Sequence, residues 1–213
     1  FEQNLLMMSA TPIPQSLALT MFGDLDISTI YAKPQGRKEI QTFLVKEGNE
    51  FNAYEAVRKE LLKGKQAYFV YPAIDSDENI KSAERAFDFL CHKVYPQHKC
   101  ALVHSKIPLE EQEKTLQQFH DGTIQVLAAT TVIEVGVDVP NATCIVIEQA
   151  DHFGMAQLHQ LRGRVGRGNE QSYCYLIYSK NITKTGIERM KALRQSTDGF
   201  YIAEQDLKLR GPG

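Results

Sequence analysis

The sequence contains no apolar run approaching 18 residues and no short apolar segment preceded by positive charge. A membrane-spanning helix needs roughly 20 apolar residues, and a secretory signal peptide needs a basic segment followed by an apolar one. We therefore expect neither a membrane span nor a signal peptide. The four cysteines lack close pairing along the chain, which predicts reduced thiols and a cytoplasmic location.

Net charge is also nearly absent, because 24 Lys and Arg residues face 26 Asp and Glu residues, giving a formal net charge of -2. This balance excludes a globally basic nucleic-acid coat, so any contact with a polyanion must use a local patch. At 213 residues and 43% hydrophobic content, the chain is long enough for a globular protein of one or two domains. It does not begin with methionine, and we expect it to be a piece of a longer protein.

A phosphate-binding loop of the form GxxxxGK[ST] is missing. The single Gly-Lys pair, Gly64-Lys65, is followed by Gln66 and precedes an expected strand. Asp77-Glu78 is the nearest match to a Walker B acidic pair, but four residues separate it from the preceding strand. Acidic residues stabilise the first turn of a helix, so a helix start explains this pair better.

One group of metal-binding residue types, Cys91, His92, His98 and Cys100, is crowded into a short segment. Its spacing matches no common zinc finger or ribbon. We interpret it as a helix end followed by a strand start.

Short apolar runs alternate with segments of helical periodicity along the chain. Strands that are apolar on both faces and joined by helices are typical of a parallel sheet covered on both sides. After Tyr178, two helical segments at Thr185–Arg194 and Phe200–Leu209 are separated by a turn at Asp198 and Gly199. We expect strands at Ile40–Val45, Ala67–Tyr71, Cys100–Val103, Ile124–Ala128, Cys144–Ile147 and Tyr173–Ile177, and helices at Phe51–Leu62, Ser82–Leu90 and Leu109–Phe119.

The segment from Gln157 to Arg167, QLHQLRGRVGR, is the most informative stretch. As a helix with about 100° per residue, it places Gln160, Arg164 and Arg167 on one face, with Met155, Leu158, Leu161 and Val165 opposite. Guanidinium groups bind phosphate oxygens bidentately, so the polar face suggests a phosphate clamp. The alternative is an ordinary solvated basic face. Gly163 and Gly166 weaken that alternative, because each costs a helix roughly 1 kcal/mol relative to alanine.

A second candidate segment runs from Val126 to Ala142. Its strand ends in Thr130 and Thr131, whose hydroxyls can donate to a phosphate, and we expect Gly136 and Asp138 to reach the same cleft at the carboxyl end of that strand. The alternative is a threonine-rich strand end without function. A weaker candidate is Ser9-Ala10-Thr11-Pro12, which follows an apolar run.

The order SATP, TTVIEVGVD and QLRGRVGR resembles motifs III, V and VI of superfamily 2 helicases. Residues 23–42 and 198–213 are similar to the RecG branch of bacterial branched-DNA translocases. The resemblance covers nearly the whole chain. It implies a RecA-like parallel sheet flanked by helices, as in a second helicase motor domain, followed by a C-terminal helical hairpin. It also implies a remnant of a first motor domain in residues 1–33, the RecA-like domain in 34–180 and a truncated translocation motif in 181–213.

On the nucleotide side, the resemblance implies that Arg167 is an arginine finger and Arg164 a second γ-phosphate contact. Gln160 would couple hydrolysis to movement. Gly136 and Asp138 would lie near the nucleotide. ATP and Mg²⁺ would bind mainly to a first motor domain that this chain lacks.

The resemblance also assigns contacts with the DNA backbone and residues that transmit the nucleotide state. Ser105 departs from the glycine that the family usually has between its histidine and the following residue. Arg189 and Arg210 would hold the helical hairpin together. The implied DNA contacts are Thr130, Thr131, His104, Ser105 and Lys106, and the implied relay residues are Ser9 and Thr11.

The resemblance implies an ATP-dependent DNA helicase that remodels stalled forks and Holliday junctions, with branched double-stranded DNA and the rest of the parent chain as partners. We expect the isolated chain to hydrolyse no ATP. The alternatives are a transcription-repair coupling translocase, a non-catalytic nucleic-acid-binding module and an RNA helicase of the same superfamily.

Overall fold

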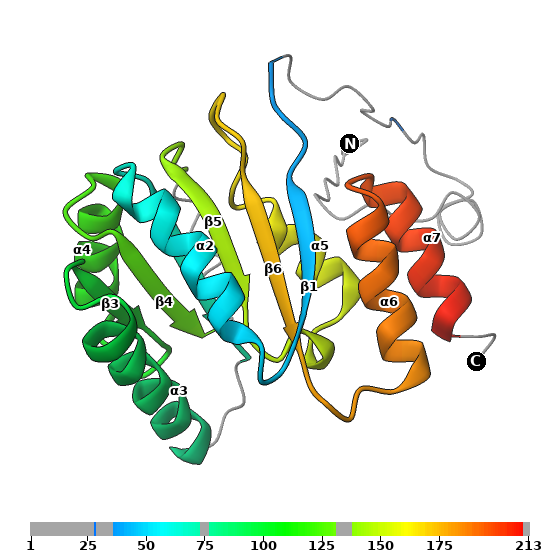
Figure 1. The fold of residues 1–213 in the computed structure, drawn as a ribbon, viewed down its shortest axis with the longest axis horizontal. Coiled ribbons are helices and arrows are strands. Elements are labelled where there is room, and N and C mark those ends of the chain that lie inside the picture. Colours follow the sequence, from blue (N-terminus) through cyan, green and yellow to red (C-terminus); the bar gives the residue numbers. More distant parts are fainter. Residues whose placement is uncertain (1–27, 29–35, 73–76, 131–137, 211–213) are drawn as a thin grey trace, which may run out of the picture.

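The computed structural model describes residues 28, 36–72, 77–130 and 138–210. Within them, one six-stranded sheet is flanked by helices, with a helical pair at one side (Figure 1). The proposed remnant in residues 1–33, including Ser9 and Thr11, lies outside the described residues apart from residue 28. Thr131 and Gly136 also lie outside them.

All six expected strands are present, with ends that lie within two residues of the sequence prediction. Every described strand pair is parallel, and the sheet order is β1-β6-β5-β2-β4-β3. The α/β prediction is therefore confirmed. The strands are β1 (Gln41–Lys46), β2 (Gln66–Tyr71), β3 (Cys100–Val103), β4 (Val126–Thr130), β5 (Ala142–Ile147) and β6 (Tyr173–Tyr178).

Alternating side chains of the strands fill two apolar cores, one on each face of the sheet. On β2, Tyr68 and Val70 pack into one core, whereas Ala67 and Phe69 pack into the other. The first core is completed by α4 (Leu109–His120), α5 (Met155–Arg162) and the helical pair. The second is completed by α2 (Glu50–Leu62), α3 (Asp77–Phe89) and the π-helical turn η1 (Leu90–Val94). The described helices include none with the length and apolar character that a membrane crossing requires.

Because the strands are parallel, all their carboxyl ends lie at one edge of the sheet, which we call the carboxyl edge. It is the lower side of the sheet in Figure 1. The amino edge lies opposite. The helix α3 begins at Asp77, as predicted for the acidic pair. The candidate zinc residues divide as expected, since Cys91 and His92 lie in η1 and Cys100 begins β3.

The predicted helix through Arg167 is wrong, because α5 ends at Arg162. Gly163 follows it as the C-cap, and Gly166 has a left-handed φ of +76°. Gly163 therefore ends the helix, and Gly166 lies in the loop beyond it, so neither glycine interrupts a helix. Val165 is nevertheless buried with Leu158 and Leu161, because the loop folds back onto the core.

The predicted helical hairpin is present as α6 (Lys184–Gln195) and α7 (Gly199–Arg210). The connection between the helices is two residues shorter than expected, since α6 continues to Gln195 and Gly199 opens α7. Thr183 caps α6 by accepting a hydrogen bond from the Gly186 amide at 3.0 Å. Both helices lie beside the β1 side of the sheet in Figure 1, and Ile202 of α7 is buried in the first core.

Candidate functional site

The loop between α5 and β6 carries two of the predicted phosphate-binding arginines. It leaves the helix through a hydrogen bond from the Arg164 amide to the Leu161 carbonyl, at 3.0 Å. The Gly166 amide then donates to Ser172 Oγ at 3.1 Å. A Cβ on Gly166 would lie 2.8 Å from Cγ1 of Ile40, so glycine is required there by both space and φ.

Arg167 lies next to Asp138. Its Nε is 3.6 Å from Asp138 Oδ1, and the Asp138 side chain is 54% exposed. The Arg167 Nε is buried and has no hydrogen-bond partner among the described residues. A Cβ on Gly168 would lie 2.9 Å from the Pro140 carbonyl oxygen, so the two segments adjoin. The structure thus brings together the arginine and the carboxylate that the resemblance paired.

Tyr68 connects this cluster to the core of the sheet. Burial raises the pKa of Tyr68 to about 12, against the opposing charges of Arg164 and Arg167, while Asp138 raises the pKa further. The charges of all three groups therefore act on the Tyr68 hydroxyl. The ring itself packs against Phe119, with 4.8 Å between centroids. We call Tyr68, Asp138, Arg164 and Arg167 the arginine cluster.

The arginine cluster does not share an edge with Thr130, contrary to the sequence prediction. Asp138 comes four residues before β5, whose first residue Ala142 pairs with Gln66. Thr130 is the last residue of β4 and pairs with Tyr71. Gln66 and Tyr71 are five residues apart on β2. At about 3.3 Å per residue, their partners Ala142 and Thr130 are therefore roughly 16 Å apart along the strand direction. Asp138 is therefore at the amino edge and Thr130 at the carboxyl edge.

At the carboxyl edge, Thr130 is the last residue of β4. The predicted His104-Ser105-Lys106 segment follows the neighbouring strand β3. Thr130 is buried, whereas Ser105 and Lys106 are exposed. The His104 ring is held between two groups, because Nε2 lies 3.7 Å from Glu84 Oε1 and Nδ1 accepts from the Lys106 amide at 3.3 Å. Exposed donors therefore stand on a fixed loop beside the end of β4.

Arg162 is a buried cation that the sequence analysis missed. It is 2% exposed and donates to Thr42 Oγ1 at 3.2 Å and to the Leu193 carbonyl. A third contact joins it to His159 Nδ1 at 3.2 Å. Burial lowers its pKa. The available signal was its position one turn after Leu158, on the buried side of α5.

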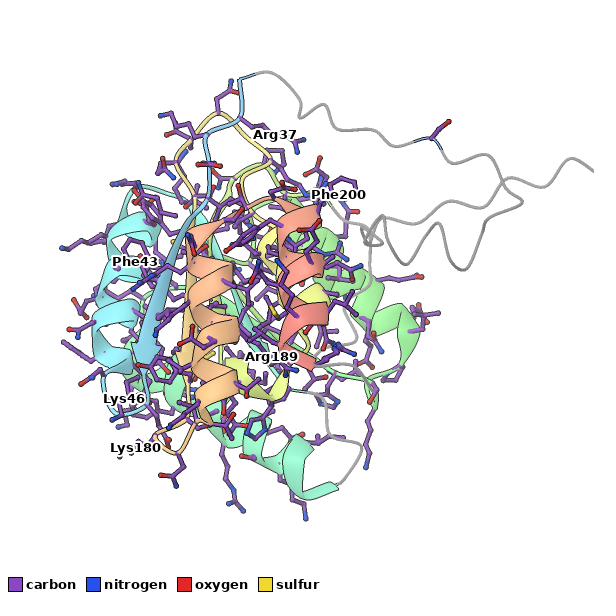
Figure 2. All side chains as sticks on the ribbon, turned by 90° about the vertical axis from the view of Figure 1, so that its right-hand side faces the viewer. Arg37, Phe43, Lys46, Lys180, Arg189 and Phe200 are labelled. Atoms are coloured by element: carbon purple, nitrogen blue, oxygen red, sulfur yellow. The ribbon has the colours of Figure 1, made fainter. Side chains whose placement is uncertain are left out.

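The two hairpin arginines meet at one carboxylate. Arg189 Nε of α6 lies 3.8 Å from Asp206 Oδ1, and an Arg210 guanidinium nitrogen lies 2.7 Å from Asp206 Oδ2. The Asp206 side chain is only 14% exposed. Figure 2 shows Arg189 on the lower part of this helical pair. Gln160, by contrast, is exposed on α5.

The sequence matches a known family over much of its length. Residues 52–169 match the family model described as helicase conserved C-terminal domain. An ATP-dependent DNA helicase RecG of Borreliella burgdorferi is 49% identical over 213 residues, which is 99% of this chain and 31% of the relative. That of Thermotoga maritima is 48% identical over 210 residues, which is 98% of this chain and 27% of the relative. The chain thus spans less than a third of these relatives.

Solved structures show the same fold. A RecG bound to a three-way DNA junction superposes with a TM-score of 0.82 at 47% identity, covering 97% of this chain and 27% of that one. Domain 2 of the DEAD-box helicase Mss116p, bound to an RNA duplex, gives a TM-score of 0.57 at 16% identity, covering 73% and 60% of the two chains. The second likeness concerns the fold alone. The expected RecA-like architecture is confirmed.

Proposed function

Because the chain belongs to the helicase conserved C-terminal domain family, we propose that it is the second motor domain of an ATP-dependent DNA helicase that remodels branched DNA in recombination and repair. The observation that carries the proposal is the arginine cluster. It presents two guanidinium groups from the loop between α5 and β6 and a carboxylate from the segment before β5, in a sequence without a phosphate-binding loop of its own. The RecG structure bound to a three-way DNA junction supports branched DNA as the substrate class. We extend the proposal to stalled forks and Holliday junctions.

The arginine cluster fits the phosphates of a nucleotide held by another motor domain. Arg167 has a buried Nε without a hydrogen-bond partner among the described residues, so an anion beside it would satisfy a desolvated donor. Arg167 acts as the arginine finger, and Arg164 is a second γ-phosphate contact beside it. Gln160 couples ATP hydrolysis to movement. The described residues contain no group of three metal-ligating side chains, so we place the Mg²⁺ ligands, like the phosphate loop, in the first motor domain.

When ATP is bound, its γ-phosphate supplies negative charge that competes with Asp138 for Arg167. Asp138 is the weaker partner, since it is half-exposed and its oxygen lies 3.6 Å from the guanidinium. Loss of the γ-phosphate returns Arg167 to Asp138. This alternation gives the two motor domains two relative positions. In this proposal Gly136 lies near the nucleotide, and Ser9 and Thr11 relay its state toward the DNA.

The carboxyl edge provides the DNA contacts in this proposal. Lys106 and Ser105 are exposed there, and Thr130 ends the adjacent strand. Thr131, the next residue in the sequence, is part of the proposed contact. Such side chains contact phosphates without distinguishing bases. Arg189 and Arg210 keep α6 and α7 together through Asp206, so that the hairpin moves as a unit.

The test is Arg167→Ala in the full-length parent protein. We expect ATP turnover to fall by a factor of about 1,000 or more, as for loss of an arginine finger, with ATP affinity changed much less. The matched control is Arg85→Ala, because Arg85 is an exposed arginine on α3. Equal loss of turnover and nucleotide binding in a folded Arg167→Ala protein would remove Arg167 from this role.

The 213-residue chain alone is expected to hydrolyse no ATP, since the sequence has neither a Walker A nor a convincing Walker B segment. DNA-stimulated turnover by the isolated chain would contradict this. The parent reading frame should encode both segments upstream of Phe1. Their absence would favour a non-catalytic nucleic-acid-binding module.

A further inference from the structure

Gln149 has a backbone conformation that its side chain does not favour. Its φ and ψ are both 48°, in the left-handed region, and it is the one non-glycine residue with positive φ within the part of the chain that the structure describes. Glycine adopts this region freely, and asparagine or aspartate tolerates it better than glutamine. Strain of this kind persists at sites where the surrounding structure enforces it, often for a functional reason.

The backbone around Gln149 is fixed from both sides. The Glu148 amide donates to the Val70 carbonyl at 2.9 Å, and the Glu148 carboxylate accepts from the Tyr54 hydroxyl at 2.7 Å. On the other side, Asp151 Oδ1 accepts from the Ser179 amide at 2.9 Å and from its hydroxyl at 3.1 Å. Gln149 is therefore held in place by buried or half-buried neighbours on β2, α2 and the end of β6.

Nothing in the described local structure requires a glutamine at this position. The Gln149 side chain is exposed, and within the described residues the hydrogen bond at this position is donated by the His152 amide to the Gln149 backbone carbonyl, at 2.9 Å. A glycine would make the same backbone bond without strain. What glutamine adds is an amide group displayed toward solvent from a rigid loop.

The position of Gln149 matches the proposed DNA contacts. It comes two residues after the end of β5, at the carboxyl edge, where Thr130 and Lys106 follow β4 and β3. In the sheet, β2 lies between β5 and β4, and β3 lies on the other side of β4. With about 4.8 Å between neighbouring strands, the ends of β4 and β3 lie roughly 10–15 Å from the end of β5. Successive phosphates of one DNA strand advance about 3.4 Å along the helix axis, so one strand could pass all three ends within a few nucleotides.

We propose that Gln149 is a further DNA-contact residue, whose side-chain amide donates a hydrogen bond to a backbone phosphate oxygen of double-stranded DNA. This inference rests on the proposed function and extends the DNA-contact edge from β3 and β4 to β5. The fixed backbone removes the entropy cost of ordering the loop when DNA binds.

The experiment measures duplex DNA affinity of the full-length parent protein carrying Gln149→Gly, over a series of salt concentrations and together with Tm. We expect Tm to stay equal or rise, because strain is relieved, and affinity to fall roughly tenfold, because a hydrogen bond to a charged group is lost. The slope of log affinity against log salt should not change, since a neutral amide releases no counterion. Gln149→Asn, which keeps the amide and suits the left-handed region, should restore more than half of the lost binding free energy.

The matched control is Gln97→Gly, because Gln97 is an exposed glutamine just before β3, at the amino edge. It should leave DNA affinity within twofold of wild type. The inference is overturned if Gln149→Gly binds DNA within twofold of wild type, if its Tm falls, or if Gln97→Gly weakens binding equally. Failure of the wild-type parent to bind DNA would instead overturn the proposed function.

Discussion

At the scale of single residues, Glu148 is a largely buried carboxylate whose protonation is linked to folding stability. Burial raises its pKa to about 7, although the hydrogen bond from Tyr54 acts in the opposite direction. The folded state therefore holds the Glu148 proton more tightly than the unfolded chain does. This contribution to stability is fully present below pH 4.5 and is lost as the pH rises through 7.

We predict that Glu148→Gln gains stability relative to wild type as the pH rises from 5 to 8. The gain should be about 2–3 kcal/mol, because the amide stays neutral where the wild-type carboxyl group ionises. Urea unfolding of both proteins at the two pH values measures it. Glu110→Gln, on the exposed side of α4, provides the control and should show no such gain. A constant difference between Glu148→Gln and wild type at pH 5 and 8 would show that Glu148 does not titrate in this range.

At the scale of elements, Arg162 joins α5 to β1 through Thr42 and to the end of α6 through Leu193. We predict that Arg162→Met destabilises the chain by about 2–4 kcal/mol, because it leaves a buried carbonyl and hydroxyl without their donor. Amide hydrogen exchange in α6 should also become faster. Arg194→Ala, an exposed change in the last turn of the same helix, should alter neither quantity appreciably. Unchanged exchange in α6 would mean that Arg162 does not tie the hairpin to α5.

The elements that sequence could predict are those in which burial alone determines the pattern. Strands such as β2 and β5 are apolar on both faces, and their runs are visible in the sequence. The extent of α5 could not be predicted this way, because Val165 is buried from a loop and so continues the helical pattern past Gly163. Tyr68 could not be assigned to the site from the sequence, because nothing in the sequence distinguishes it from the other buried residues of β2. Which edge Asp138 occupies depends on the path of residues 131–137, which spacing does not reveal.

At the scale of the whole molecule, the arginine cluster and the residues that we propose contact DNA lie at opposite edges of one sheet. Their effects should therefore be separable, since sites this far apart without shared partners usually act independently. In the full-length parent protein, Lys106→Ala should weaken DNA binding several-fold and reduce the salt slope by about one, because one phosphate contact is lost. ATP affinity should stay within twofold of wild type. Arg167→Ala should show the reverse, with turnover lost and the salt slope unchanged.

Titration of fluorescent duplex DNA across a salt series gives the DNA affinity and the salt slope. Nucleotide binding and ATP hydrolysis, measured in parallel, give the ATP affinity and the turnover. Lys59→Ala, an exposed lysine on α2, controls for loss of positive charge in general and should leave the salt slope unchanged. A reduced slope in Arg167→Ala would place DNA phosphates at the amino edge. The arginine cluster would then be part of the nucleic-acid surface, and the division of the sheet into a nucleotide edge and a DNA edge would be wrong.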